Sequence, residues 1–302
     1  TFGMMISIQF IIGQVNAPLN EIISYIYIIQ DTKISMERLS YVQNHENEME
    51  ENKNYIPVPE LKEDIVFKNV SFRYGGGLSP IILDDISFSI PSKKKTAIVG
   101  MSGCGKTTII KLLLGLYKPT SGSILINNAD IQDINLEDWR DLCGTVMQDG
   151  YIFSDTIYDN ICLNDKKFEE EEVSTAAEIA NIGDFISELP LKYKTMVGSN
   201  GIGLSTGQKQ RILIARAVCK NPEVIIFDEA TNSLDANNEL IILDKMDSYL
   251  RDKTSIIIAH RLSTVKDADQ IIVLKKGRVE EIGRHNDLID RKGEYYNLVN
   301  NQ

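Results

Sequence analysis

The sequence has 302 residues, of which 43% are hydrophobic and 25% charged, the composition of a globular protein with a substantial core. Its formal net charge of −11 at pH 7 argues against non-specific binding to nucleic acid, which needs a basic surface. The four cysteines form neither a zinc knuckle nor a CxxC pair, so we expect free thiols in a reducing compartment.

The first 30 residues carry a single charged side chain, Glu21. As a helix, residues 4–29 are long enough to cross a bilayer, because about 20 helical residues span about 30 Å. The polar side chains within this stretch and Pro18 indicate a helix that faces a bundle interior or a watery cavity. The alternative is a buried helix of a soluble domain. Because the chain begins with Thr1 rather than Met, we expect it to be part of a longer protein.

The next residues change character twice. Residues 31–43 continue as a charged amphipathic helix, whereas residues 44–60 are acidic and polar and contain Pro57 and Pro59. The latter composition is typical of a linker. We therefore predict a helical segment at 1–43, a linker at 44–60 and a globular domain at 61–302.

The globular part opens with strand patterns. Residues 65–72 alternate as a half-buried strand does, and residues 81–83 and 86–90 resemble further strands, which predicts an antiparallel β layer. The next predicted elements are a strand at 96–99, a helix at 109–116, a strand at 123–126, a helix at 136–142 and a strand at 145–148.

Residues 149–220 are mainly helical in pattern, most clearly at 169–180 and 208–219, and we expect a helical subdomain there. Continuous apolar runs at 224–228 and 255–259 predict parallel strands covered on both faces. The remaining predicted elements are a helix at 237–249, a hairpin of strands at 271–274 and 278–282, and tail helices at 285–289 and 295–299. The fold class is therefore α/β, with a parallel core sheet, an antiparallel β layer and a helical subdomain.

The loop between the strand at 96–99 and the helix at 109–116 fits G-x-x-x-x-G-K-[ST], the pattern of a phosphate-binding loop. Its glycines let backbone N–H groups point inward, and the start of the helix adds a positive potential. Lys106 would reach the outer phosphates and the Thr107 hydroxyl would bind Mg²⁺. Cys104 lies inside the loop, so alkylation there should block nucleotide binding. The alternative is a turn that merely joins strand to helix.

Two further stretches supply partners for this loop. Asp228 ends a buried strand, where it would hold Mg²⁺, and Glu229 follows it and could polarise the attacking water. The alternative for this pair is a cap of the next helix. Residues 204–208 open the helix at 208–219 and would form a second anion site, although Ser-Thr-Gly is also ordinary N-cap chemistry.

Residues 60–302 resemble the ATPase domain of ABC transporters, a P-loop NTPase, in the order and spacing of these motifs. The resemblance implies that Tyr74 stacks on adenine. The Walker A loop that would bind the nucleotide comprises Gly100, Ser102, Gly103, Cys104, Gly105, Lys106, Thr107 and Thr108. It also implies that Gln148 contacts Mg²⁺ together with Thr107 and Asp228, that Glu229 is the catalytic glutamate, and that His260 senses the γ-phosphate.

The same resemblance implies a paired enzyme. Two ATPase domains would associate head to tail as a homodimer or with a similar chain, with ATP held between Walker A of one and the signature of the other. The signature residues are Leu204, Ser205, Thr206, Gly207 and Gln208, and the D-loop residues are Ser233, Leu234 and Asp235. Thr206 stands where the family usually has glycine, but Ser205 and Gly207 are present, so we expect ATP hydrolysis to persist.

The N-terminal stretch and residues 154–161 are similar to exporters that fuse membrane and ATPase domains. This implies that residues 1–43 end a transmembrane domain in the inner or plasma membrane, with the ATPase domain on the cytoplasmic face. Among exporters, the chain most resembles peptidase-containing bacteriocin transporters, which implies a peptide cargo, with a lipid, drug or toxin as the alternative. A soluble ABC ATPase acting on DNA or ribosomes, and a regulatory module without turnover, are the rival functions.

Overall fold

The computed structural model describes residues 2–44, 47–49, 53–75, 79–163, 168–198, 201–228, 242, 245–258 and 265–300. The chain divides into two compact units, Thr1–Asn54 and Tyr55–Gln302. Each unit is described by itself below.

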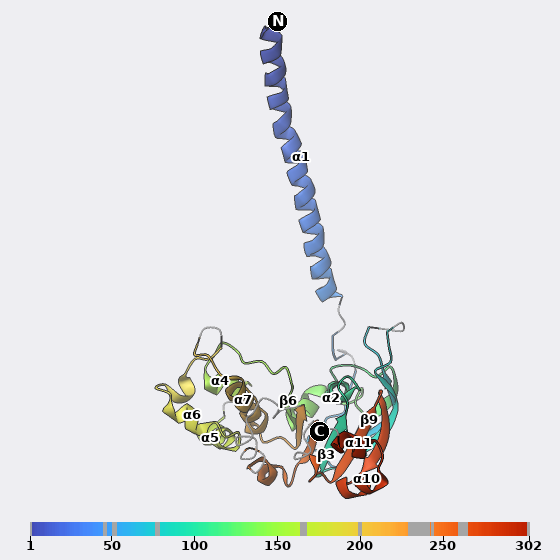
Figure 1. The fold of residues 1–302 in the computed structure, drawn as a ribbon. Helices are drawn as coiled ribbons and strands as arrows, with labels where there is room; N and C mark the ends of the chain where they lie inside the picture. The colour runs from blue at the N-terminus through green and yellow to red at the C-terminus, as the bar shows by residue number, and fades with distance from the viewer. Residues whose placement is uncertain are drawn as a thin grey trace. The chain divides into compact units, whose positions relative to one another are not determined.

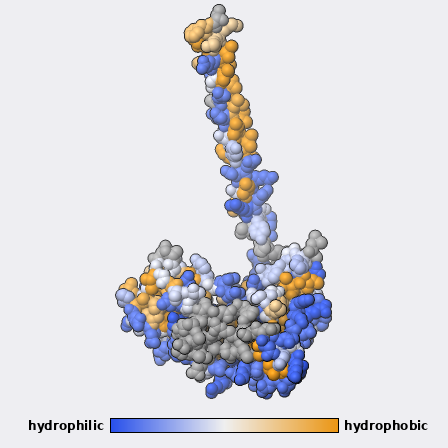
Figure 2. All heavy atoms as spheres, viewed as in Figure 1, coloured by the Kyte–Doolittle hydropathy of each residue, from blue (hydrophilic) through white to orange (hydrophobic). Residues whose placement is uncertain are grey.

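The first unit is dominated by one helix, α1 (Phe2–Gln43), which continues through Pro18 (Figure 1). This single helix includes both stretches predicted to be helical, residues 4–29 and 31–43. Its large apolar side chains are exposed, and Figure 2 shows them along most of the helix. By length and hydropathy α1 is a candidate membrane span. A core helix of a soluble protein and a signal sequence near the N-terminus pass the same test.

The second unit contains two sheets. The six-stranded sheet has the order β10-β9-β3-β8-β7-β6, and the four-stranded sheet has the order β2-β1-β4-β5. In the larger sheet, β6, β7, β8, β3 and β9 are parallel neighbours and β10 is antiparallel to β9. The smaller sheet is antiparallel throughout. The strands are β1 (Ile65–Phe72), β2 (Leu83–Ile90), β3 (Lys95–Gly100), β4 (Ser121–Ile126), β5 (Ala129–Asp130), β6 (Cys143–Val146), β7 (Val224–Asp228), β8 (Thr254–Ile258), β9 (Gln270–Lys275) and β10 (Arg278–Gly283).

The larger sheet is buried on both faces, as its continuous apolar strands predict. Successive side chains of a strand point to opposite faces. In β7, Val224 and Ile226 belong to the core cluster that includes β1, β2 and α2, whereas Ile225 and Phe227 belong to the cluster that includes α5 and α7. The sheet is thus the middle layer of the unit.

Helices cover the sheets and form a separate helical part. They are α2 (Lys106–Leu113), α3 (Leu136–Leu142), α4 (Ile157–Ile161), α5 (Glu170–Ile179), α6 (Gly183–Glu188), the 3-10 turn η1 (Lys192–Lys194), α7 (Thr206–Cys219), α10 (His285–Arg291) and α11 (Glu294–Asn300). Figure 1 shows α4, α5, α6 and α7 together at the β6 end of the larger sheet. This region corresponds to the mainly helical pattern at 149–220.

One strand prediction is wrong because of a bulge. The sequence predicts separate strands at 81–83 and 86–90, but the chain forms the single strand β2. Asp85 has a φ of 53° and receives a hydrogen bond of 3.0 Å from the Asn69 side chain, in a region where the register of β1 and β2 shifts. The bulge lets two aspartates interrupt the apolar pattern without ending the strand.

A second strand prediction is displaced by two residues. The strand predicted at 145–148 corresponds to β6, which runs from Cys143 to Val146. These four residues pair in parallel with Val224 to Phe227 of β7. A Cβ on Gly144 would lie 2.2 Å from the Ala217 carbonyl oxygen. Glycine therefore allows β6 and α7 to approach closely and does not break the strand.

The bounds of β1, α3 and β7 agree with the predictions, whereas other described elements have ends shifted by up to a few residues. For example, α2 begins three residues before its predicted start at 109. The short strand β5 has no counterpart among the predictions. Of the helix predicted at 237–249, the structure describes residue 242 and the helical residues from 245 onward. Ala259, predicted to end a strand, lies outside the described residues.

Candidate nucleotide-binding site

The phosphate-loop sequence connects β3 to α2 and folds around the side chain of Lys106. The Lys106 Nζ donates hydrogen bonds of 2.8 Å to the carbonyl oxygen of Gly100 and 3.1 Å to that of Met101. The lysine side chain is 6% exposed. A buried ammonium group that donates to two backbone carbonyl oxygens in this loop suits an anionic ligand.

The backbone of the loop requires glycine at two positions. Gly105 caps the start of α2 with a φ of 106°, and a Cβ there would lie 2.6 Å from the Leu83 Cδ2 atom. At Gly100 a Cβ would lie 2.3 Å from the Leu274 carbonyl oxygen. Both positions thus exclude a side chain, by backbone conformation or by lack of space. A loop backbone of this kind and the first turn of α2 together suit an anionic ligand.

A cavity of about 640 Å³ lies against this loop. It is lined by Tyr74, Ile82, Ser102, Gly103, Gly105, Lys106, Thr107, Thr108 and Gln148. The structure therefore brings Tyr74 and Gln148, which are far from the loop in sequence, to the same cavity. Gly100 and Cys104 are not among the described residues that line it. Ile82 was not among the predicted site residues, because an isolated apolar residue carries no sequence signal for ligand contact.

Tyr74 is held by its neighbours at one side of the cavity. Its hydroxyl lies 3.2 Å from the Thr108 hydroxyl, and its ring packs edge-on against Phe72 and Tyr117, with centroids 4.8 and 5.2 Å apart. These contacts fix the ring orientation. Tyr117 is a second residue that the sequence did not single out, and it acts here as packing for the ring of Tyr74.

Asp228 lies at the same edge of the larger sheet as the loop. It is fully buried at the end of β7 and pairs with Ile258 of β8, which in turn pairs with Ile98 of β3. Two strand spacings, about 10 Å, thus separate its backbone from β3. The carboxyl ends of parallel strands form the edge at which α/β sheets bind ligands. The oxygen donors of Asp228, Thr107 and Gln148 are of the type that Mg²⁺ prefers, so the residues present fit such an ion.

The signature residues form a regular helix start. Ser205 caps α7: its hydroxyl accepts a 3.2 Å hydrogen bond from the Gln208 N–H, and the Gln208 Oε1 accepts a 2.8 Å bond from the Ser205 N–H. This is a capping box. None of the five residues from Leu204 to Gln208 is among the described residues that line the cavity. Glu229, Ser233, Leu234, Asp235 and His260 lie outside the described residues.

Comparison with known proteins identifies the family. Residues 83–232 match the family described as ABC transporter, and this stretch includes the loop at 100–107, Gln148, the helix start at 204–208 and Asp228. The chain carries an ABC transporter ATP-binding domain.

Relatives of the ABC domain match almost the whole chain. It is 43% identical over 300 residues to the Toxin RTX-III translocation ATP-binding protein of Actinobacillus pleuropneumoniae, covering 99% of this chain and 42% of that protein. It is 41% identical over 299 residues to the Alpha-hemolysin translocation ATP-binding protein HlyB of Escherichia coli, with the same coverage of 99% and 42%. The chain thus spans less than half the length of these curated relatives.

A solved structure supports the same fold. The structure described as a bacterial Atm1-family ABC exporter with ATP bound is 39% identical to this chain, with a TM-score of 0.83. The match covers 91% of this chain and 48% of that one. The ABC ATPase fold predicted from the motifs is therefore confirmed.

The cysteine within the loop of the ABC domain offers a direct probe. Cys104 is buried, and its burial raises the pKa of the thiol, an effect that the Lys106 charge partly opposes. At neutral pH the thiol is therefore protonated, and we expect slow maleimide labelling that accelerates by about tenfold per pH unit until the raised pKa is reached. Labelling requires the loop to open, so bound ATP should slow it further.

Mass spectrometry of the Cys104 peptide with and without ATP measures this protection. The Cys104→Ser variant gives the background, because Cys143, Cys162 and Cys219 are also buried. Labelling of Cys104 at the same rate with and without saturating ATP would show that the nucleotide does not close this loop.

Proposed function

We propose that this chain is the ATP-binding and ATP-hydrolysing part of an ABC exporter, which couples ATP-driven dimerisation to export of a cargo across a membrane. The observation that carries the proposal is the cavity in which Tyr74, Lys106, Thr107 and Gln148 converge, in a chain that also holds a 42-residue helix long and apolar enough to span a membrane. In this proposal residues 1–43 end a transmembrane domain, residues 44–60 are a linker and residues 61–302 are the ATPase domain.

Each described residue of the cavity has a role in this proposal. Lys106 binds the outer phosphates of ATP, and the backbone of residues 100–107 and the first turn of α2 hold the remaining phosphate charge. Tyr74 stacks on the adenine ring. Thr107, Gln148 and Asp228 would hold Mg²⁺, which when bound neutralises charge on the phosphate oxygens. Glu229 orients and polarises the attacking water, and His260 contacts the γ-phosphate.

The site is completed by a second ABC subunit. The signature residues Leu204 to Gln208 do not line the cavity of their own chain, so we assign them to the ATP of a partner, together with the D-loop residues at 233–235. A second copy of this chain is the simplest partner. ATP binding would close the two chains on each other, and hydrolysis would let them separate.

The printed names of the relatives bear on the class of cargo. Proteins named for translocation of a toxin or a hemolysin share 41% to 43% identity with this chain, which supports the alternative of a toxin cargo. We propose export of a toxin or another peptide from the cytoplasmic side of an inner or plasma membrane. Within this class, the resemblance to peptidase-containing bacteriocin exporters stays a prediction, and the full-length sequence would test it by the presence of a cysteine-protease domain.

The full-length protein tests the exporter function. We expect it to remain in the membrane pellet after a carbonate wash, which releases peripheral proteins, and to hydrolyse ATP when purified in detergent. Recovery of the full-length protein in the soluble fraction after ultracentrifugation would favour the soluble ABC ATPase instead. Membrane retention without Mg²⁺-dependent ATP hydrolysis would favour the regulatory module.

A further inference from the structure

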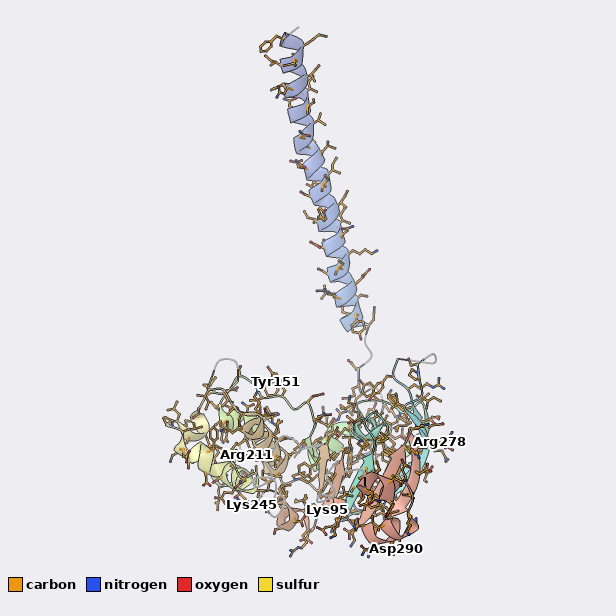
Figure 3. The ribbon with its side chains drawn as sticks, in the orientation of Figure 1. Lys95, Tyr151, Arg211, Lys245, Arg278 and Asp290 are labelled. Atoms are coloured by element: carbon orange, nitrogen blue, oxygen red, sulfur yellow. The ribbon has the colours of Figure 1, made fainter. Side chains whose placement is uncertain are left out.

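A chain of polar contacts joins the signature helix to the helical segment that follows β7. Its centre is Asn181, which lies just beyond the end of α5 with a left-handed φ of 53°. From one side, Lys245 donates hydrogen bonds of 3.0 Å to the Asn181 side-chain oxygen and 3.0 Å to the Glu178 carbonyl oxygen. From the other side, Arg211 of α7 donates a 2.7 Å bond to the Asn181 carbonyl oxygen. Figure 3 labels Arg211 and Lys245, which approach this same end of α5.

Arg211 carries the contact to the start of α7. It lies four residues after Gly207, and its Nε donates a 3.4 Å hydrogen bond to the Gly207 carbonyl oxygen. Residues four apart on a helix share a face. The position of Asn181 is therefore linked through one side chain to the helical turn that holds the signature glycine.

The segment that carries Lys245 is itself fixed to the core of the domain. Residues 245–250 are helical, and Met246 and Leu250 within them are only 4% and 7% exposed. Asp247 forms a 3.0 Å ion pair with Lys95, the first residue of β3, and β3 leads into the phosphate loop. Because the backbone of residues 245–250 is held against the core in this way, the Lys245 side chain couples the position of the core to the end of α5.

We propose that Lys245 is a positioning residue for ATP turnover: through Asn181 and Arg211 it holds the first turn of α7 in the orientation that the partner's ATP requires. This inference rests on the proposed function, in which Gly207 faces the nucleotide of a second subunit. Lys245 touches none of the described residues that line the cavity by a hydrogen bond. Its loss should therefore lower turnover without lowering the affinity of the phosphate loop for ATP.

The chain offers a matched control in Lys253. Its Nζ donates hydrogen bonds of 2.7 Å to the Asn221 side-chain oxygen and 2.7 Å to the Pro222 carbonyl oxygen. Asn221 also has a left-handed φ, 48°, just beyond the end of α7. Lys253 thus makes the same kind of contact just beyond the C-terminal end of α7. Because α7 has 14 residues, this contact lies about 20 Å from the signature turn at the start of the helix.

The experiment compares the full-length Lys245→Met, Lys245→Arg and Lys253→Met proteins. We expect Lys245→Met to lower kcat for ATP hydrolysis by about tenfold, with the dissociation constant for ATP within twofold of wild type. Lys245→Arg should keep kcat close to that of wild type, because a guanidinium can donate to the same two oxygens. Lys253→Met should keep kcat within twofold of wild type. Thermal unfolding of all three checks that the fold is retained.

A double variant tests the route through Asn181. Asn181→Gly removes the side-chain oxygen but keeps the carbonyl and tolerates the left-handed φ. We expect the double variant, Asn181→Gly with Lys245→Met, to lose no more kcat than Lys245→Met loses alone. Additive losses, equal losses in Lys245→Met and Lys253→Met, or a wild-type kcat in Lys245→Met would each overturn the inference. No ATP hydrolysis by the wild-type protein would instead overturn the proposed function.

Discussion

Lys106→Ala should abolish ATP binding. The Lys106 ammonium is buried against the carbonyl oxygens of Gly100 and Met101, so it is already placed beside the loop that would receive the phosphates. Hydrogen bonds to charged groups contribute about 1.5–3 kcal/mol each, and loss of the ammonium also leaves phosphate charge without its counterion. We expect the dissociation constant to rise by about a hundredfold or more. Titration with a fluorescent ATP analogue measures it directly.

Thermal unfolding gives an independent measure of the same change. A ligand at about 100 times its dissociation constant stabilises the folded state by about 2.7 kcal/mol. ATP should therefore raise the melting temperature of the wild-type protein but not that of Lys106→Ala. Lys118→Ala removes the same charge from an exposed side chain beyond α2 and should bind as wild type does. Micromolar affinity retained in Lys106→Ala would remove the phosphate-loop assignment.

Glu229→Gln should stop hydrolysis while leaving ATP binding intact. The substitution keeps the size of the side chain but removes the carboxylate that we propose to polarise the attacking water. General-base catalysis contributes about 10²- to 10⁴-fold to rate, so we expect steady-state phosphate release to fall by at least about a hundredfold. Because the nucleotide still binds but is not consumed, an ATP-bound dimer should accumulate and elute earlier on gel filtration.

The control for Glu229→Gln is Glu280→Gln, which makes the same charge change at an exposed position of β10. Its rate of ATP hydrolysis should equal that of wild type. If Glu229→Gln and wild type hydrolyse ATP at equal rates, Glu229 does not have the role proposed for it, and another group must orient the water.

Much of the core of the fold follows from local sequence pattern. The bounds of β1, α3 and β7 agree with the predictions, because their apolar spacing is regular and their ends coincide with polar or turn residues. In α3 the Asn135 side chain accepts hydrogen bonds from the N–H groups of Glu137 and Asp138, and this is a cap that the sequence itself shows. Where local signals agree with the tertiary structure, pattern alone suffices.

The predictions that failed depend on partners distant in sequence. The sequence around β2 contains two aspartates that look like a turn, but β1 and β2 pair through them with a bulge. Likewise, the start of β6 is fixed by its pairing with β7. Cys143, the first residue of β6, pairs with Val224, which lies 81 positions later in the sequence. No window of a few residues contains that information.

The candidate site shows the same division. The loop at 100–107 is visible in sequence because phosphate binding constrains glycines, lysine and threonine at fixed spacing. The convergence of Tyr74 and Gln148 on its cavity required family resemblance, since each lies more than 25 residues from Gly100. Ile82 and the packing of Tyr117 against Tyr74 required the structure, because apolar contacts carry no motif.

The capping box of α7 has a thermodynamic consequence for assembly. Ser205 and Gln208 exchange two hydrogen bonds within one chain, so the turn that would meet a partner is preorganised. Fixing the backbone of one loose residue costs about 1–2 kcal/mol, and a disordered turn would subtract that cost from the free energy of association. Here the ordering entropy is lost when each chain folds. In the proposed dimer, the free energy of nucleotide binding therefore contributes to association of the two chains, because this turn does not have to order when they meet.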